Sequence, residues 1–474
     1  MEFFLYKKNI PVLIFEEDDE QNITQVTKVL NVEHLPVHLY TNAKPDASNL
    51  YGICEKLKDF LNNRMIPYNR KYFQSVLDDL EVDSAYTLAK KSHFLSLSDQ
   101  YWILRKDEIG SLWWNDVNFF TNEYDSAIGL RLVNNSSDLN RNSNSHSPDN
   151  TTNGELPKRW VRKDGVNFLE KAGTGTEQLE PINEVLASEI CKRLGINYIP
   201  YTYEIRDNQY YSLCPDIVDE NHEMVPMESV YHDIHLEENQ CYSFEKLITR
   251  CEELGIPNTC EDLLKMLLLD FIIANEDRHT YNISFIRETE SRKWIGVAPV
   301  YDSGKSMFLN KLDFEISMTS SFRIPSKPFA DTQIKQFNLL PFEQLYGKID
   351  LEKLSGIDKW YSKLLSKLVR ISDDKKAALV EVLMQRITEA ASLLHKKYEE
   401  SGVMFIKNGK KSSSQIVLEA LQKNPHLTKE ELETATNLSR ATITRALSDL
   451  RSQNKITRVG SNKTGYWRIS NYLN

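Results

Sequence analysis

The chain has 474 residues, of which 41% are apolar and 27% are charged. This length predicts more than one domain, and the composition is that of an ordinary soluble protein, which excludes the disordered and fibrous classes. No run of residues is long and apolar enough to span a bilayer, and the N-terminal sequence lacks the basic-then-apolar pattern of a secretory signal. Six scattered cysteines form no CxxC pair. Reduced thiols and a cytoplasmic location are therefore expected.

The charge is distributed unevenly along the chain. The net charge of −10 argues against general binding of polyanions. Residues 401–474, however, hold 12 Lys and Arg against 5 Asp and Glu, a balance of +7, which leaves −17 for the first 400 residues. The C-terminal segment therefore differs in kind from the rest.

Residues 1–133 read as an accessory region. A strand-like run covers Glu2–Phe15, and apolar residues recur at helical spacing in Asn49–Asn63. Two segments dense in aromatic residues, 96–104 and 112–120, are expected to form its core. Residues 134–153 are rich in Asn, Ser and Asp, so we expect a flexible polar loop that buries too little surface to become ordered.

Residues 154–213 predict a strand-rich lobe that binds nucleotide. A β-hairpin turning at 163–165 ends on Lys171, and a helix over Pro181–Leu194 stops at Gly195. Residues 214–400 predict a mainly helical lobe. Its long helices are expected at Tyr242–Leu254, Asn258–Ala274, Leu351–Arg370 and Asp373–Tyr398. Strands followed by helices, each set around its own core, are the two-lobed plan of a protein kinase.

An octet of polar residues, Asn275 to Asn282, follows the buried helix at Asn258–Ala274. Its Asp277 and Asn282 have the Asp-x-x-x-x-Asn spacing of a phosphoryl-transfer loop. In such loops the Asp receives the proton of the acceptor hydroxyl, and the Asn holds Mg²⁺. Arg278 and His279 are expected to brace the loop. By itself this octet could equally be a polar helix cap.

Other residues appear in the order that a kinase requires. Asp302 precedes Ser303-Gly304 as a metal-binding Asp would, and Lys171 is placed to neutralise phosphates with Glu184 on the next helix as its partner. The turn from Thr151 to Lys158 is a candidate phosphate loop, because Gly154 lets backbone amides approach oxygens. We predict Asp277, Lys171 and Glu184 as catalytic and Asn282 and Asp302 as Mg²⁺ ligands. The residues predicted to meet ATP are Gly154, Lys158, Lys171, Leu213, Cys214, His279, Asn282 and Asp302.

Residues 412–472 predict a winged helix-turn-helix domain. Three helices, each opened by a Ser or Thr cap, cover Ser414–Lys423, Thr428–Thr436 and Ser439–Asn454, and Ile456–Val459 and Tyr466–Ile469 form a hairpin. A basic third helix suits the major groove of DNA, with wing contacts to the backbone. Such domains also dock proteins. The candidate DNA-binding residues are Arg440, Thr442, Thr444, Arg445, Arg458 and Lys463.

Residues 150–400 resemble the HipA family of bacterial serine/threonine kinases, the toxin kinases of persistence modules. Asn275 to Asn282 match the family's N-x-D-R-H-x-x-N, and Pro299 to Asp302 match its P-x-Y-D. Lys171 and Glu184 fit the family's lysine and helix glutamate. The resemblance implies an α+β, two-lobed kinase-like fold that uses ATP and Mg²⁺ and phosphorylates a Ser or Thr of a protein.

The resemblance also implies that the kinase phosphorylates its own phosphate loop and so switches itself off. Thr151 and Thr152 are the hydroxyls nearest Gly154 and are the candidates here. The chain departs from the family in two ways. Its first 130 residues do not match the short N-terminal domain, and its winged helix is fused, whereas DNA binding in these systems usually belongs to a separate antitoxin. DNA or an antitoxin-like protein is the partner expected at the winged helix.

Two other functions remain open from the sequence. The chain could be a DNA-binding transcriptional regulator whose kinase-like domain only senses nucleotide. The complete set of Lys171, Glu184, Asp277, Asn282 and Asp302 argues against this. The Asp-Arg-His-x-x-Asn loop is also similar to that of phosphoinositide kinases, so a lipid or small molecule could accept phosphate. No basic amphipathic segment supports a membrane partner.

Overall fold

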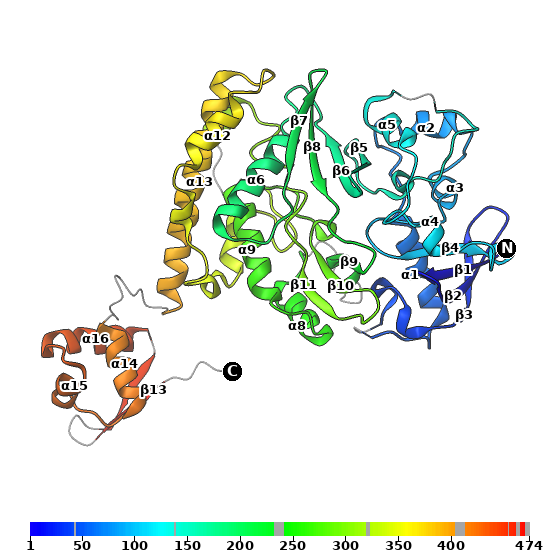
Figure 1. Ribbon diagram of the computed structural model, residues 1–474. Helices are drawn as coiled ribbons and strands as arrows, with labels where there is room; N and C mark the ends of the chain where they lie inside the picture. The colour runs from blue at the N-terminus through cyan, green and yellow to red at the C-terminus, as the bar shows by residue number, and fades with distance from the viewer. Residues whose placement is uncertain are drawn as a thin grey trace. The chain divides into compact units, whose positions relative to one another are not determined.

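The computed structural model describes residues 1–41, 44–136, 139–231, 241–318, 323–402, 413–453, 455–460 and 465–469. The chain divides into two compact units, Met1–Ala390 and Ala391–Asn474. Figure 1 shows the helices and strands of both units. No helix in these ranges is long and apolar enough to cross a membrane.

The accessory region is built on an antiparallel sheet of order β3-β2-β1-β4. The predicted run Glu2–Phe15 is a hairpin rather than one strand, because the chain reverses at Lys8, whose φ is +48°. Helix α1 packs beside β3 and buries Ile53, Leu57 and Leu61, the face that the apolar spacing predicted. The strands are β1 (Glu2–Lys7), β2 (Ile10–Glu17), β3 (Ile23–Val29) and β4 (Tyr101–Arg105), and α1 covers Leu50–Asn62.

The aromatic segments of this region form its core, as predicted. Trp102, Trp114 and Phe119 are buried in one cluster, against which Trp160 of the next lobe also packs. A second cluster joins three short helices, α2 (Phe73–Asp79), α3 (Ala85–Lys90) and α5 (Ala127–Asn134). The short helix α4 (Trp114–Val117) contributes Trp114 to the first cluster.

The expectation that residues 134–153 bury too little surface to become ordered is wrong for their second half. Pro148–Thr151 form a 3-10 helix capped by Ser147, and residues 147–152 are buried. The apolar content of this segment is low, but several of its polar groups form hydrogen bonds with the accessory region. Asn150 Nδ2, for example, donates to Ser92 Oγ at 3.1 Å. Order here comes from polar partners that are distant in sequence, which composition does not reveal.

The strand-rich lobe is an antiparallel sheet of order β5-β6-β8-β7 with helix α6 packed against β8. Lys171 lies near the end of β6, as predicted. Helix α6 ends at Gly195, whose φ of +68° is the left-handed conformation that the predicted stop requires. The elements are β5 (Lys158–Lys163), β6 (Val166–Ala172), α6 (Glu180–Leu194), β7 (Thr202–Arg206) and β8 (Gln209–Pro215).

The helical lobe also contains a three-stranded sheet of order β11-β10-β9. The prediction of one helix over Leu351–Arg370 is wrong. A 3-10 turn at Leu351–Leu354 is separated from α12 by Gly356, whose φ of +77° breaks the helix, and α12 ends at Leu365. The elements are β9 (His222–Pro226), α7 (Met227–Tyr231), α8 (Phe244–Leu254), α9 (Thr259–Ile272), β10 (Ser284–Glu288), β11 (Trp294–Val297), α10 (Asp313–Met318), α11 (Gln333–Leu339), α12 (Ile357–Leu365) and α13 (Asp373–Glu400).

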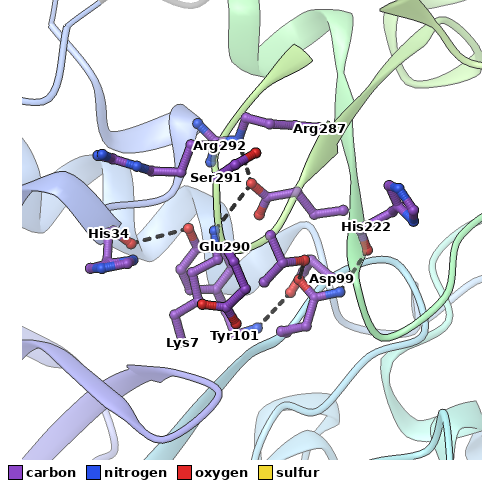
Figure 2. Close-up of polar contacts among 12 residues, drawn as sticks. Lys7, His34, Asp99, Tyr101, His222, Arg287, Glu290, Ser291 and Arg292 are labelled. Carbon is purple, nitrogen blue, oxygen red and sulfur yellow. Dashed lines mark hydrogen bonds and ion pairs between the residues drawn. The ribbon is translucent and has the colours of Figure 1, made fainter. Parts of the chain in front are cut away.

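A buried ionic cluster joins the accessory sheet to the paired strands β9 and β10 (Figure 2). Lys7 of β1 pairs with Glu223 of β9 at 3.3 Å, and Arg287 of β10 pairs with the same carboxylate. Arg287 also donates to the hydroxyl of Tyr40 at 3.1 Å. All three charges are nearly fully buried. Because removing one member would leave another charge buried without its partner, the cluster ties the two regions together.

The second unit has the predicted winged-helix elements. Thr428 and Glu431 form the predicted capping box at the start of the second helix. The core contains Val417, Leu432, Ile443 and Trp467. The elements are α14 (Ser413–Lys423), α15 (Lys429–Thr436), α16 (Arg440–Ser452), β12 (Ile456–Val459) and β13 (Tyr466–Ile469), close to the predicted bounds.

Candidate active site

One cleft of about 650 Å³ collects most of the predicted site residues. Its walls come from the strand-rich lobe, from the helical lobe and, unexpectedly, from the accessory region through residues such as Phe60 and Arg64. The predicted residues that line it are Thr151, Thr152, Gly154, Lys158, Lys171, Cys214, Asp277, His279, Asn282 and Asp302. Glu184 and Leu213 are not among the lining residues described.

Lys171 is the centre of the polar network in this cleft. Its Nζ lies 2.7 Å from Asp302 Oδ1 and 3.2 Å from Glu184 Oε1. Glu184 also accepts a hydrogen bond from the backbone N–H of Ser303 at 2.8 Å. Glu184 therefore reaches the site through Lys171 and holds both the lysine and the Asp302 loop, as its predicted pairing with Lys171 requires.

The opposite charges in this network stabilise the ionised forms of Lys171 and Asp302. Burial alone would lower the pKa of Lys171, but Asp302, Tyr201 and Glu184 raise it well above its ordinary value. Burial would raise the pKa of Asp302, yet Lys171 and Lys158 hold it below its usual range. Lys171 is therefore a cation and Asp302 an anion.

The backbone around Asp302 is held in an unusual conformation. Asp302 has a φ of +53°, in the left-handed region that non-glycine residues rarely adopt. The side chain of Asn183 on α6 donates to the carbonyl oxygens of Gly304 at 2.9 Å and Ser306 at 2.7 Å. A Cβ on Gly304 would lie 3.2 Å from Glu180 Cβ, so helix α6 packs closely against this loop. Strain of this kind is typical of functional sites.

The catalytic loop (residues 275–282) is braced by a buried arginine. Arg278 forms a two-bond pair with Asp270 of α9, each bond 2.9 Å long. It also donates to the carbonyl oxygens of Asn282 at 2.9 Å and Tyr301 at 2.6 Å. Arg278 thus braces the loop, as predicted. Its partner Asp270 was missed, because it lies within an apolar helix and has no motif of its own.

Asp277 faces two lysines that the sequence did not single out. Lys327 Nζ lies 2.9 Å from Asp277 Oδ1, and Lys305 Nζ lies 3.0 Å from Oδ2. Although burial alone would raise the pKa of Asp277, hydrogen bonds from Lys327 and Lys305 lower it below its ordinary value. Asp277 is therefore ionised at neutral pH, as a proton acceptor must be.

The side chains of Asn282 and Asp302 suit a magnesium ion. Asn282 Nδ2 donates to the carbonyl of Asp277 at 2.9 Å, which leaves its side-chain oxygen as the atom able to bind a cation. Amide and carboxylate oxygens are ligands that Mg²⁺ prefers. Among the described residues no three His, Cys, Asp or Glu gather to hold a metal by themselves.

The phosphate loop (residues 151–158) curves around the ammonium group of Lys158. Gly154 has a φ of +101°, and a Cβ there would lie 2.5 Å from Lys158 Nζ. Burial and the nearby charge of Arg70 lower the pKa of Lys158 to about 7. Thr151 and Thr152, the candidate acceptors of autophosphorylation, are buried, and their hydroxyls donate to the carbonyls of Leu95 and Pro148. In this conformation neither hydroxyl is exposed.

At the end of β8, Cys214 lines the cleft, whereas Leu213 packs on the opposite face of the sheet with Val133. Successive side chains of a strand point to opposite faces, so these two neighbours could not both meet a ligand with their side chains. Asp216, which the sequence did not single out, lines the cleft two residues further on. Its Oδ2 is buried without a partner among the described residues, and burial raises the pKa of its carboxyl well above the ordinary value.

In the winged helix, the candidate DNA-binding residues lie on the outer side of α16 and on the wing. Arg445 is exposed. Arg440 is exposed but pairs with Glu430 at 3.1 Å. Thr442 contacts the capping Ser439, Thr444 donates to the Arg440 carbonyl, and Arg458 lies over the ring of Trp467. Lys463 lies outside the described residues.

Comparison with known proteins agrees with this geometry. Residues 140–354 match the HipA-like C-terminal domain, and residues 415–457 match a winged helix-turn-helix DNA-binding domain. No curated protein matches the chain significantly in sequence.

Two solved structures are similar in fold. A chain from the complex of the Shewanella oneidensis MR-1 toxin antitoxin system HipA, HipB and its operator DNA is 14% identical, with 84% of this chain and 99% of that chain covered and a TM-score of 0.50. The Helicobacter pylori proinflammatory kinase CtkA is 16% identical, with 52% of this chain and 95% of that chain covered and a TM-score of 0.42. The predicted α+β, HipA-like kinase fold with a C-terminal winged helix is confirmed. The part of this chain that the Shewanella match leaves uncovered is shorter than the accessory region. The structural likeness therefore extends into the accessory region, which was not predicted from the sequence.

Proposed function

We propose that this chain, which carries a HipA-like C-terminal domain and a winged helix-turn-helix domain, is an ATP- and Mg²⁺-dependent serine/threonine protein kinase. The observation that supports this most directly is the bridge from Lys171 to both Glu184 and Asp302 in the cleft that Asp277 and Asn282 also line. A kinase needs a lysine, two aspartates and an asparagine in one cleft, and Lys171, Asp277, Asp302 and Asn282 line this one.

Each residue has a role in the proposed reaction. Lys158 and Lys171 neutralise the negative charge of the phosphates, and the peptide N–H groups near Gly154 approach their oxygens. Asn282 and Asp302 hold the magnesium ion, which supplies further positive charge at the phosphates when it is bound. Asp277 orients the acceptor hydroxyl and receives its proton. Because such a transfer needs mainly positioning and neutralised charge, these residues account for most of the chemistry.

The test is transfer of the labelled γ-phosphate of ATP by the wild type and by Asp277→Asn. We expect the variant to lose about three powers of ten in rate, since it keeps the shape of the side chain but cannot accept a proton. Asp331→Asn changes an exposed acid that pairs with Lys335; it is the matched control and should transfer at the wild-type rate. Equal melting temperatures would show that the fold is intact. Undiminished transfer by Asp277→Asn would refute the proposal.

We also propose that the winged helix binds duplex DNA. The Shewanella relative is described with an antitoxin and operator DNA, and the basic and hydroxyl side chains of α16 lie on its outer side here. A helix of this kind reads the major groove. From the same comparison we propose a toxin or regulatory role for the kinase.

This second proposal is tested on the full-length chain by fluorescence anisotropy with labelled duplex at two salt concentrations. Arg445→Glu should weaken binding at least about tenfold, because it replaces an attraction to phosphate by a repulsion. Glu419→Gln, on another helix of the same domain, serves as a control that also changes the charge. If Arg445→Glu binds DNA as the wild type does, Arg445 is not a DNA contact. If the wild type itself does not bind the duplex, the domain acts instead by docking a protein such as an antitoxin.

A further inference from the structure

Six consecutive residues, 150–155, each share a hydrogen bond with the accessory region. Thr151 Oγ1 donates to the carbonyl of Leu95 at 2.6 Å, and Asn153 Nδ2 donates to the carbonyl of Asn63 at 2.9 Å. Glu155 accepts from Asn69 at 2.9 Å. The remaining three are Asn150, held by Ser92, and Thr152 and Gly154, both held by Arg70.

Arg70 makes the central contact of this set. Its Nε donates to the carbonyl of Gly154 at 2.8 Å, and its Nη2 donates to the carbonyl of Thr152. Its side chain is only 2% exposed. Arg70 is not among the described residues that line the cleft, whereas residues 151–156 line it continuously. The guanidinium therefore holds the phosphate loop from its outer side.

This contact fixes the direction of two peptide groups. In a trans peptide the N–H points away from the C=O. Because Arg70 takes the carbonyls of Thr152 and Gly154, the N–H groups of Asn153 and Glu155 point away from Arg70. Neither N–H donates a hydrogen bond within the described part of the chain. Two donors are thus left on the cleft side of the loop, where successive N–H groups form a concavity that binds anions.

We propose that Arg70 of the accessory region is a positioning residue for the nucleotide phosphates: it grips two loop carbonyls from outside and so turns the N–H groups of Asn153 and Glu155 toward the cleft. This inference rests on the proposed function, since it assigns those N–H groups to the phosphates of ATP. The accessory region is then part of the kinase machinery although Arg70 touches no reacting atom.

A planar guanidinium suits this task better than an ammonium group. Its fork presents parallel donors at a fixed spacing that matches two carbonyls, whereas the donors of a lysine all leave one nitrogen on a flexible chain. Hydrogen bonds from a charged donor are also stronger than neutral ones. Arg70→Lys keeps the charge but loses the fork, so it separates geometry from charge.

The experiment measures the affinity of the full-length protein for ATP with Mg²⁺ and for adenosine, by calorimetry. For Arg70→Gln we expect the ATP affinity to fall about 10- to 100-fold, as losing one or two charge-assisted hydrogen bonds implies. The ATP affinity of Arg70→Lys should lie between those of Arg70→Gln and the wild type. Adenosine affinity should stay unchanged, because adenosine has no phosphates. A general loss of structure would lower the affinities for ATP and for adenosine equally. Arg131→Gln, which breaks an accessory-region pair with Asp79, is the matched control and should bind both ligands as the wild type does.

A second measurement needs no ligand. Amide hydrogen exchange of the free protein should rise in residues 150–156 of Arg70→Gln and stay unchanged in the catalytic loop. Asn153→Ala removes the exposed hydrogen bond to the Asn63 carbonyl and carries little risk to folding. It should raise exchange in the same residues, but less than Arg70→Gln does. Wild-type ATP affinity together with wild-type exchange in Arg70→Gln would overturn the inference. A wild-type protein that binds neither ATP nor adenosine would instead overturn the proposed function.

Discussion

The catalytic loop and the phosphate loop are both short polar segments, but they are held in place in different ways. Arg278 braces the catalytic loop with Asp270, eight residues earlier, and with the carbonyl of Asn282, four residues later. Residues 150–155 are held by partners that lie 56 to 90 residues earlier in the chain. The catalytic loop is braced by residues that are near it in the sequence, whereas the phosphate loop is held by the accessory region. Local sequence can therefore specify the first loop but not the second.

The largest effect is expected where the local brace is broken. Arg278→Met leaves Asp270 buried without its partner, which should destabilise the protein by about 3–5 kcal/mol. Thermal unfolding measures this loss. Lys335→Met, which removes only an exposed pair with Asp331, should unfold as the wild type does. A small effect at Arg278 would mean that the catalytic loop is not held locally.

A pH effect is expected at the start of the phosphate loop. Burial raises the pKa of Asp149 to about 7, whereas an unfolded Asp titrates near about 4. Between these values the folded protein keeps a proton that the unfolded chain releases, so stability falls as the pH rises. Asp149→Asn cannot titrate and should be more stable than the wild type at pH 8 by on the order of 2–4 kcal/mol, with the difference vanishing near pH 4. Denaturation at both pH values is the measurement. A constant difference would contradict it.

A smaller effect is expected at Gly154. A side chain at a φ of +101° costs about 1–2 kcal/mol, and here it would also meet Lys158. Gly154→Ala should therefore weaken ATP binding as well as stability. Gly165→Ala in the hairpin turn, with a φ of +77° and open space around it, carries similar strain without touching the loop. If both variants bind ATP equally well, the shape of the phosphate loop is less important than we infer.

The smallest effect is expected at Lys327. Its hydrogen bond lowers the pKa of Asp277, which burial alone would raise. In Lys327→Ala the pKa of Asp277 should rise, so the acidic limb of the pH profile of kcat/KM should move to higher pH by less than about one unit. Lys335→Ala provides the control. A shift to lower pH would show that Asp277 is not the titrating base.

The same contrast explains what the sequence could predict. Helix α6 and its stop at Gly195, the capping box of Thr428 and Glu431, and the spacing of Asp277 and Asn282 are all local signals. The contacts of Arg70 and Lys327 are not, because each residue meets its partner only after distant parts of the chain have come together. The burial of residues 147–152 belongs to this second group. Composition alone predicted the opposite, because it does not count hydrogen bonds to distant segments.

The pair of Lys7 and Glu223 has a consequence for the order in which the protein is made. The ribosome produces the accessory strand β1 before β9, so the carboxylate that Lys7 needs emerges 216 residues later. Until then the lysine has no charged partner from β9, and burying it would be costly. The accessory sheet therefore completes its packing only after much of the helical lobe has been synthesised. Strand β1 is thus translated well before β9, but its packing is completed only together with β9.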